Sequence, residues 1–206
     1  MIPSAEMDMV MAMMMGDFNP NHDPKTGRFA EGDGSRSVGL SMNLKYYEKE
    51  IRRKPVEHGV LLAESGRLKF KKTDNNPNQV SYTYREAKRM KDAILTHNHP
   101  DSGGTFSPAD IKCAIHTGLK EIRAVDKRFT YSLVRRFKIG DNVPASYKDF
   151  GRDYGKYASS RRKYWLLNAS SGREATRKFL EDLNGWLEQN SANYGWDYER
   201  TEDYAR

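Results

Sequence analysis

The hydrophobic and polar positions between residues 41 and 84 follow first a helical and then a strand-like pattern. Residues 41–53 carry apolar side chains three or four positions apart, which is the spacing of one helix face, and Pro55 ends this pattern. Three later segments show the apolar runs or the two-residue alternation of strands: residues 56–63, 67–73 and 79–84. We therefore predict one helix followed by three strands in this part of the chain.

The pattern continues to change period up to residue 138. Residues 85–91 form a basic connection or short helix, and the apolar run 92–97 is typical of a buried strand. A helix is expected over residues 108–116, followed by strands over residues 119–126 and 129–138. Because helices and strands are interleaved, the sequence predicts an α/β fold with a mixed β-sheet flanked by helices.

The two ends of the chain differ from the middle in composition. Residues 16–38 are rich in Gly, Pro, Asn and Asp and have no apolar period, which is typical of a flexible segment. Near the other end, Ser171 and Glu174 have the spacing of a capping box, and the apolar stripe after them would pack on the body or on a partner protein. We therefore predict three parts: a flexible N-terminal arm 1–38, a central domain 39–144 and a helical C-terminal extension 145–206.

Composition limits the classes of function. Hydrophobic residues make up 37% of the 206 residues, and no apolar run approaches the roughly 20 residues of a membrane span, so we expect no membrane association. The Met-rich stretch near the start lacks the basic residues that begin a signal peptide. The single cysteine, Cys113, excludes an intramolecular disulfide and a cysteine-based zinc finger, and it fits a cytoplasmic protein.

Positive charge is concentrated in the middle of the chain. The net charge is +7, and residues 37–144 alone carry 21 basic and 12 acidic side chains. Such an excess could attract nucleic acid or an acidic protein partner, although a solvated surface accounts for it more simply.

The stretch Ala93–Ile111 carries the candidate chemistry. In an extended segment His97 and His99 point to the same face, so their imidazoles can converge on one metal ion. Ser107 fits a helix N-cap with Pro108 after it, and this places Asp110 in the first turn of a helix, where a carboxylate is also favoured for structural reasons. Two imidazoles and one carboxylate leave a fourth position for water, as catalytic zinc requires.

A zinc-bound water needs a carboxylate nearby to accept its proton. Two candidates precede the histidines in the sequence, Glu57 and Glu64. Glu57 opens an apolar run that could lie on a neighbouring strand, whereas Glu64 is next to the turn residues Ser65 and Gly66, which favour solvent. We therefore prefer Glu57 as the general base.

The joint spacing of these residues resembles the motif of the JAMM (MPN) metalloprotease family. His97 and His99 are followed by seven residues, Ser107, two residues and Asp110, and the stretch Glu57–Leu62 is similar to the family's base-bearing strand. Over residues 41–138 the resemblance implies a cytidine-deaminase-like sheet and a zinc site formed by the two histidines and the aspartate. It further implies that Glu57 is general base and acid, that Ser107 stabilises the oxyanion, and that the protein hydrolyses peptide or isopeptide bonds in a protein or peptide substrate.

Asn98 is a departure from the eukaryotic deubiquitinases, which usually have serine between the histidines. The sequence HNHP is closer to the RadC-like branch, whose role leaves a nucleic-acid-associated function open. The segment DPKTGRFA resembles phage head-associated proteins, so a phage structural or assembly role that uses the fold as a scaffold is a further alternative. The expected location is the cytoplasm of a bacterium or of a phage-infected cell.

Overall fold

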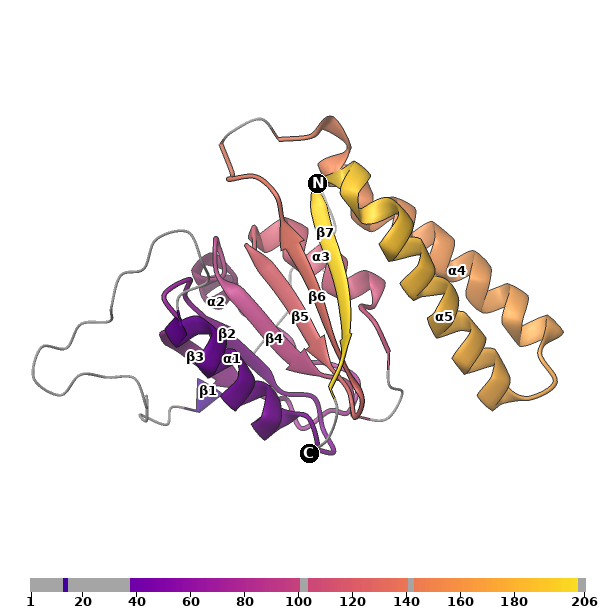
Figure 1. The fold of residues 1–206 in the computed structure, drawn as a ribbon, viewed down its shortest axis with the longest axis horizontal. Coiled ribbons are helices and arrows are strands. Elements are labelled where there is room, and N and C mark those ends of the chain that lie inside the picture. The colour runs from indigo at the N-terminus through magenta and orange to yellow at the C-terminus, as the bar shows by residue number, and fades with distance from the viewer. Residues whose placement is uncertain (1–12, 15–37, 101–103, 141–142, 204–206) are drawn as a thin grey trace, which may run out of the picture.

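The described strands form one mixed β-sheet (Figure 1). The computed structural model describes residues 13–14, 38–100, 104–140 and 143–203. Its strands are β1 (Met13–Met14), β2 (Gly59–Leu62), β3 (Leu68–Lys72), β4 (Ile94–Asn98), β5 (Glu121–Val125), β6 (Phe129–Arg135) and β7 (Trp196–Glu202). Their order is β1-β3-β2-β4-β5-β6-β7, in which β4 and β5 are parallel and the other neighbours are antiparallel. The predicted α/β class is confirmed.

Helices pack on both faces of this sheet (Figure 1). The α-helices are α1 (Val38–Ile51), α2 (Tyr84–Arg89), α3 (Pro108–Thr117), α4 (Phe150–Asn168) and α5 (Gly172–Asn190), and two 3-10 turns, η2 (Ala145–Asp149) and η3 (Ser191–Tyr194), flank the last two helices. Helix α3 connects the parallel strands β4 and β5, so its N-terminus lies beyond the carboxyl end of β4. No described helix combines the length and the apolar composition that a membrane crossing requires.

The two-residue period of the strands divides the core into two layers. Val60 and Leu62 of β2 pack with helix α1, whereas Leu61 between them packs in the larger layer on the other face. That larger layer also contains Leu95 of β4 and Ile111 of α3. All five side chains are buried, and burying each one stabilises the fold by about 1.5–3 kcal/mol.

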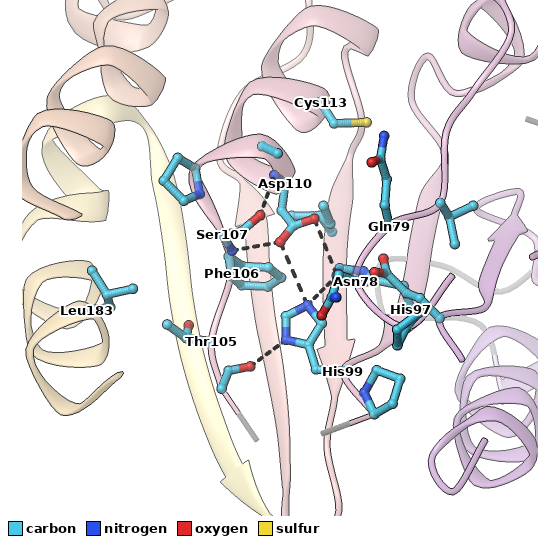
Figure 2. A pocket seen from close by; sticks show the side chains of 18 of the residues that line it. Asn78, Gln79, His97, His99, Thr105, Phe106, Ser107, Asp110, Cys113 and Leu183 are labelled. Carbon is cyan, nitrogen blue, oxygen red and sulfur yellow. Dashed lines mark hydrogen bonds and ion pairs between the residues drawn. The ribbon is translucent and has the colours of Figure 1, made fainter. Parts of the chain in front are cut away.

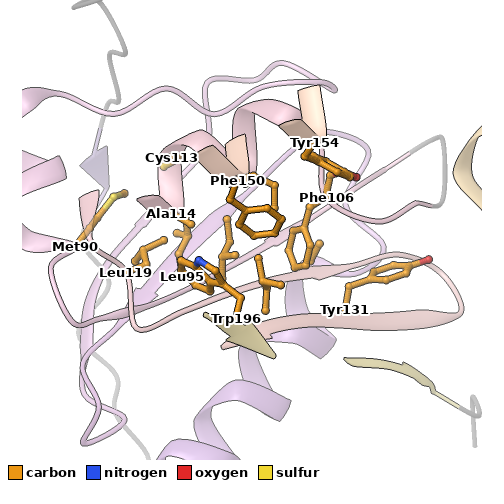
Figure 3. Packing of buried hydrophobic residues seen from close by; sticks show 14 of the residues in the cluster. Met90, Leu95, Phe106, Cys113, Ala114, Leu119, Tyr131, Phe150, Tyr154 and Trp196 are labelled. Carbon is orange, nitrogen blue, oxygen red and sulfur yellow. The ribbon is translucent and has the colours of Figure 1, made fainter. Parts of the chain in front are cut away.

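The C-terminal part of the chain belongs to the same larger core layer (Figure 3). Phe150 and Tyr154 of α4, Leu187 of α5 and Trp196 of β7 are buried there against residues of the central domain. The predicted apolar stripe therefore packs on the body of the protein: its members are Phe179, Leu183, Trp186 and Leu187. Ser171 caps α5 as expected, because its side chain accepts the N–H of Glu174.

Two expectations about secondary structure were wrong. Residues 79–84 are not a strand, because Thr83 forms a capping box with Glu86 and starts helix α2 at Tyr84. Residues 196–202 are not helical. Gly195 has a φ of +82°, which ends the preceding turn, and β7 then pairs with β6 along its whole length. The C-terminal extension therefore adds a strand to the sheet as well as two helices.

The expected arm 1–38 lies almost entirely outside the described residues. Within it, Met13–Met14 form β1 next to β3, and helix α1 already begins at Val38.

Candidate metal centre

Strand β4 presents two histidines at its carboxyl end. His97 lies on β4 and His99 directly follows it, and both imidazoles point toward the N-terminus of α3 (Figure 2). Their Nε2 atoms are 3.0 Å apart. His97 is only 2% exposed, so its ring is held in the protein interior. The two-residue spacing thus brings the two ring nitrogens together as predicted.

Helix α3 supplies the third group through its N-cap. The side chain of Ser107 accepts the backbone N–H of Asp110 at 3.2 Å, and Oδ2 of Asp110 accepts the N–H of Ser107 at 2.7 Å. This capping box fixes the carboxylate of Asp110: its Oδ1 lies 3.4 Å from Nε2 of His97, and its Oδ2 lies 3.8 Å from Nε2 of His99. The structural and the ligand interpretations of Asp110 are therefore compatible.

The three groups have the spacing of metal ligands. Ligands placed tetrahedrally at 2.0–2.1 Å from a zinc ion lie about 3.3 Å from one another. The two ring nitrogens are 3.0 Å apart, and one ligand atom from each of the three residues lies within 4.8 Å of the others, so a divalent cation could be held between them after shifts of the side chains. His97, His99 and Asp110 can therefore bind a metal.

A hydrogen bond to the backbone orients the ring of His99. Its Nδ1 lies 2.8 Å from the carbonyl oxygen of Gly104, which can only accept, so Nδ1 carries the proton. In the neutral ring the lone pair is then on Nε2, which faces His97 and Asp110. The backbone thus selects the tautomer that a metal ligand needs.

Electrostatics in the site favour a positive charge. Burial lowers the pKa of His97, but the Asp110 carboxylate outweighs it and raises this pKa to about 9. Burial raises the pKa of Asp110, yet His97, His99 and the Ser107 N–H together hold it well below its usual range. Burial and the neighbouring His97 lower the pKa of His99. Without a metal, one proton on His97 supplies the charge that a cation would replace.

Glu57 reaches the same site from the neighbouring strand. Strands β2 and β4 are antiparallel with Gly59 opposite His97, so the residues just before β2 lie beside the end of β4. Glu57 is 9% exposed and lines the same pocket as the three candidate ligands. Burial raises its pKa to about 7, although His97 opposes this shift. The other candidate, Glu64, is exposed in the turn at the opposite end of β2.

Asn98 holds the segment that carries Glu57. Its side chain is fully buried and points away from the imidazoles, since it lies between them on the strand. Oδ1 accepts the N–H of His58 at 2.7 Å, and Nδ2 donates to the carbonyl oxygens of Val56 at 3.1 Å and Lys54 at 3.3 Å. The asparagine that separates the histidines thus connects strand β4 to the segment that carries Glu57.

A pocket of about 480 Å³ surrounds these groups (Figure 2). Phe179, Leu180 and Leu183 of α5 form one wall, and the segment from Pro77 to Tyr82 contributes another. Sequence reasoning did not assign these walls to the site. The stripe on α5 predicted packing, but its partner was not specified by any local pattern.

The remaining candidate side chains take no part in this chemistry. His58 contacts the carbonyl of Val56 through Nδ1, and His116 is exposed at the last turn of α3. Cys113 lines the pocket, but burial raises its pKa to about 12, so its thiol stays protonated. His22 lies outside the described residues.

Comparison with family models, with curated proteins and with solved structures gave no match for this chain. The argument on function therefore depends on the residues and geometry of the site.

Proposed function

We propose that the protein is a zinc-dependent metallopeptidase or isopeptidase of the JAMM (MPN) type. The observation that carries this proposal is the convergence of His97, His99 and Asp110, one ligand atom from each lying within 4.8 Å of the others, with the buried carboxylate of Glu57 in the same pocket. Zinc suits two imidazoles and one carboxylate, and three protein ligands leave one position for water. The resemblance in spacing to the JAMM motif supports the same assignment.

Zinc in this site would lower the pKa of a bound water to about 7 and polarise the carbonyl of the substrate. Glu57 would accept the proton at its carboxylate and later donate it to the leaving nitrogen. Burial raises the pKa of Glu57 in the metal-free site, which makes its carboxyl group easier to protonate and suits a group that must both accept and donate a proton.

Ser107 is suited to stabilise the developing oxyanion. Its oxygen accepts the N–H of Asp110, which leaves its O–H proton available as a donor. The side chain is exposed at the rim of the pocket, at the N-terminus of α3, where the helix dipole also favours negative charge.

The test compares the wild-type chain with Glu57→Gln and Glu64→Gln. We expect the wild type to contain one zinc per chain by elemental analysis and to cleave a peptide library derived from a bacterial proteome. Glu57→Gln should keep its zinc and lose about 10²-fold or more of its activity, because the general base is removed. Glu64→Gln, the matched control, should behave as wild type. Full activity in Glu57→Gln would refute the assignment of the base, and a wild type that binds no zinc would refute the proposal.

The other two functions predicted from the sequence lead to different outcomes. A wild-type chain that binds zinc but cleaves no peptide would favour a scaffold role in assembly. A nucleic-acid-associated role predicts DNA binding that weakens steeply with salt.

A further inference from the structure

A second groove, of about 680 Å³, opens beside the metal centre. It shares His99, Pro100 and Gly104 with the pocket that holds the candidate ligands. Helix α5 forms one side, and the turn between β5 and β6 together with β7 forms the other. A chain lying in this groove would therefore lead directly to the metal centre.

The groove is lined mainly by positive charge. Five basic side chains line it: Lys127, Arg128, Arg173, Arg177 and Arg200. Two acidic side chains from the described part of the chain line it, and both have partners. Asp126 accepts three hydrogen bonds from the β5–β6 turn and from Tyr131, and Glu181 pairs with Arg177.

Three of these cations have no carboxylate partner among the described residues. Arg128 pairs with Glu202, but no ion pair joins Lys127, Arg173 or Arg200 to an acidic side chain in the described part of the chain. All three are exposed, so they can meet an anionic ligand without giving up an internal ion pair.

The turn that carries Lys127 is held rigidly. Oδ1 of Asp126 accepts the N–H groups of Arg128 and Phe129, each at 2.7 Å. The guanidinium groups of Arg128 and Arg200 lie 5.1 and 5.2 Å from the centre of the Phe129 ring, within the range of cation–π contacts. The cations on this wall are thus positioned before any ligand binds.

We propose that this groove binds an acidic segment of the polypeptide substrate, whose scissile bond then lies at the metal centre. The inference rests on the proposed peptidase function and names its substrate class. A peptide is favoured over nucleic acid because the groove is continuous with the pocket of the candidate catalytic residues, which would act on a peptide bond, and because it contains the aliphatic side chain of Leu180.

A binding assay separates this inference from catalysis. The probe is a fluorescein-labelled ten-residue peptide of alternating Glu and Gly, and its matched control has Gln in place of Glu. Fluorescence anisotropy is measured with the zinc-supplemented full chain, with Lys127→Glu/Arg173→Glu, which changes one cation on each wall, and with Lys45→Glu/Lys49→Glu. The last variant makes the same change of charge on exposed positions of α1, on the opposite face of the sheet.

We expect the wild type and the α1 variant to bind the Glu peptide equally and the groove variant to bind it at least 10-fold more weakly. The Gln peptide should not bind measurably. Equal binding of the Glu peptide by all three proteins would overturn the proposal. So would a groove variant that loses affinity for a 20-nucleotide single-stranded DNA but not for the peptide, because the groove would then serve nucleic acid.

Because the assay measures no turnover, its result does not depend on Glu57. If the groove variant binds the Glu peptide as tightly as the wild type while the wild type cleaves its substrate, the groove proposal alone is refuted. If the groove variant binds the peptide more weakly as expected but Glu57→Gln stays fully active, the catalytic assignment alone is refuted. Both groove substitutions are at exposed positions, so the groove variant should unfold at nearly the same temperature as the wild type, which thermal denaturation would check.

Discussion

Replacing Asn98 with alanine tests how the segment that carries Glu57 is held beside the histidines. The substitution leaves both imidazoles in place and removes a side chain that does not face the metal centre. It deletes three hydrogen bonds, one accepted from His58 and two donated to the carbonyls of Lys54 and Val56. The expected effect is therefore on the position of the base and on stability rather than on metal binding.

The magnitude follows from these three interactions. Each hydrogen bond contributes about 1 kcal/mol net, and a buried N–H left without an acceptor costs about 1–3 kcal/mol. We expect Asn98→Ala to lower the free energy of unfolding by about 3 kcal/mol, a large part of the 5–15 kcal/mol typical of a folded domain. Asn98→Ser should lose less, because its hydroxyl can replace one of the bonds.

Urea denaturation measures the loss of stability, and amide hydrogen exchange at His58 reports directly on the hydrogen bond between its N–H and Asn98. Asn43→Ala is a suitable control, since Asn43 is also buried and donates to Gly66 far from the site. Both variants should be destabilised, but only Asn98→Ala should show faster exchange at His58 and a lower kcat at an unchanged zinc content. A loss below 1 kcal/mol with unchanged protection of His58 would refute the reasoning.

Three further predictions concern the metal centre and helix α3. In the metal-free protein the His97–Asp110 pair should stabilise the fold most between about pH 4 and 6.5. This contribution should fall as the pH rises from 6.5 through about 9, where folded His97 deprotonates, and also as the pH falls below 3.8, toward the lowered pKa of Asp110. Thermal unfolding in the presence of a chelator should show both losses of stability. Added zinc should remove the loss at high pH. Ser107→Ala should cost about 1 kcal/mol in urea denaturation through loss of the N-cap and also lower kcat, whereas Ser107→Thr should restore the stability. Gly118→Ala should lower the thermal midpoint with normal zinc content, because Gly118 has a φ of +67° and a Cβ there would lie 2.5 Å from Cδ1 of Ile139.

The convergence of the three candidate metal ligands could be predicted from the sequence because each position depends on a local rule. Two-residue spacing on a strand brings His97 and His99 to one face, and a capping box starts a helix at Ser107 and fixes Asp110. Both rules act within a few residues, so no knowledge of the tertiary fold was required. The choice of Glu57 needed more, because its proximity depends on the antiparallel pairing of β2 with β4.

One of the two failures arose where a distant partner decided the structure. Strand β7 is polar, and its apolar residues Trp196 and Tyr198 are too few to distinguish a strand from a continuing helix. It becomes a strand because its backbone pairs with the edge of β6, about 60 residues earlier in the chain. The other failure is local: residues 79–84 alternate as a strand does, but Thr83 and Glu86, three residues apart, form a capping box that starts a helix.

The hydrogen bonds around the site show how its groups are oriented without a metal. Oδ2 of Asp110 accepts the N–H of Ser107, so Oδ1, which faces His97, stays available to a cation. Nδ1 of His99 is bonded to the Gly104 carbonyl, which leaves its Nε2 available. Because two of the three candidate ligands are held by the backbone, little side-chain entropy remains to be lost when a cation binds. Folding therefore already fixes the orientation of these two side chains. Substitutions that remove the hydrogen bonds to Asp110 or His99 should weaken metal affinity because they disturb the orientation of the candidate ligands, even though the ligands themselves are retained.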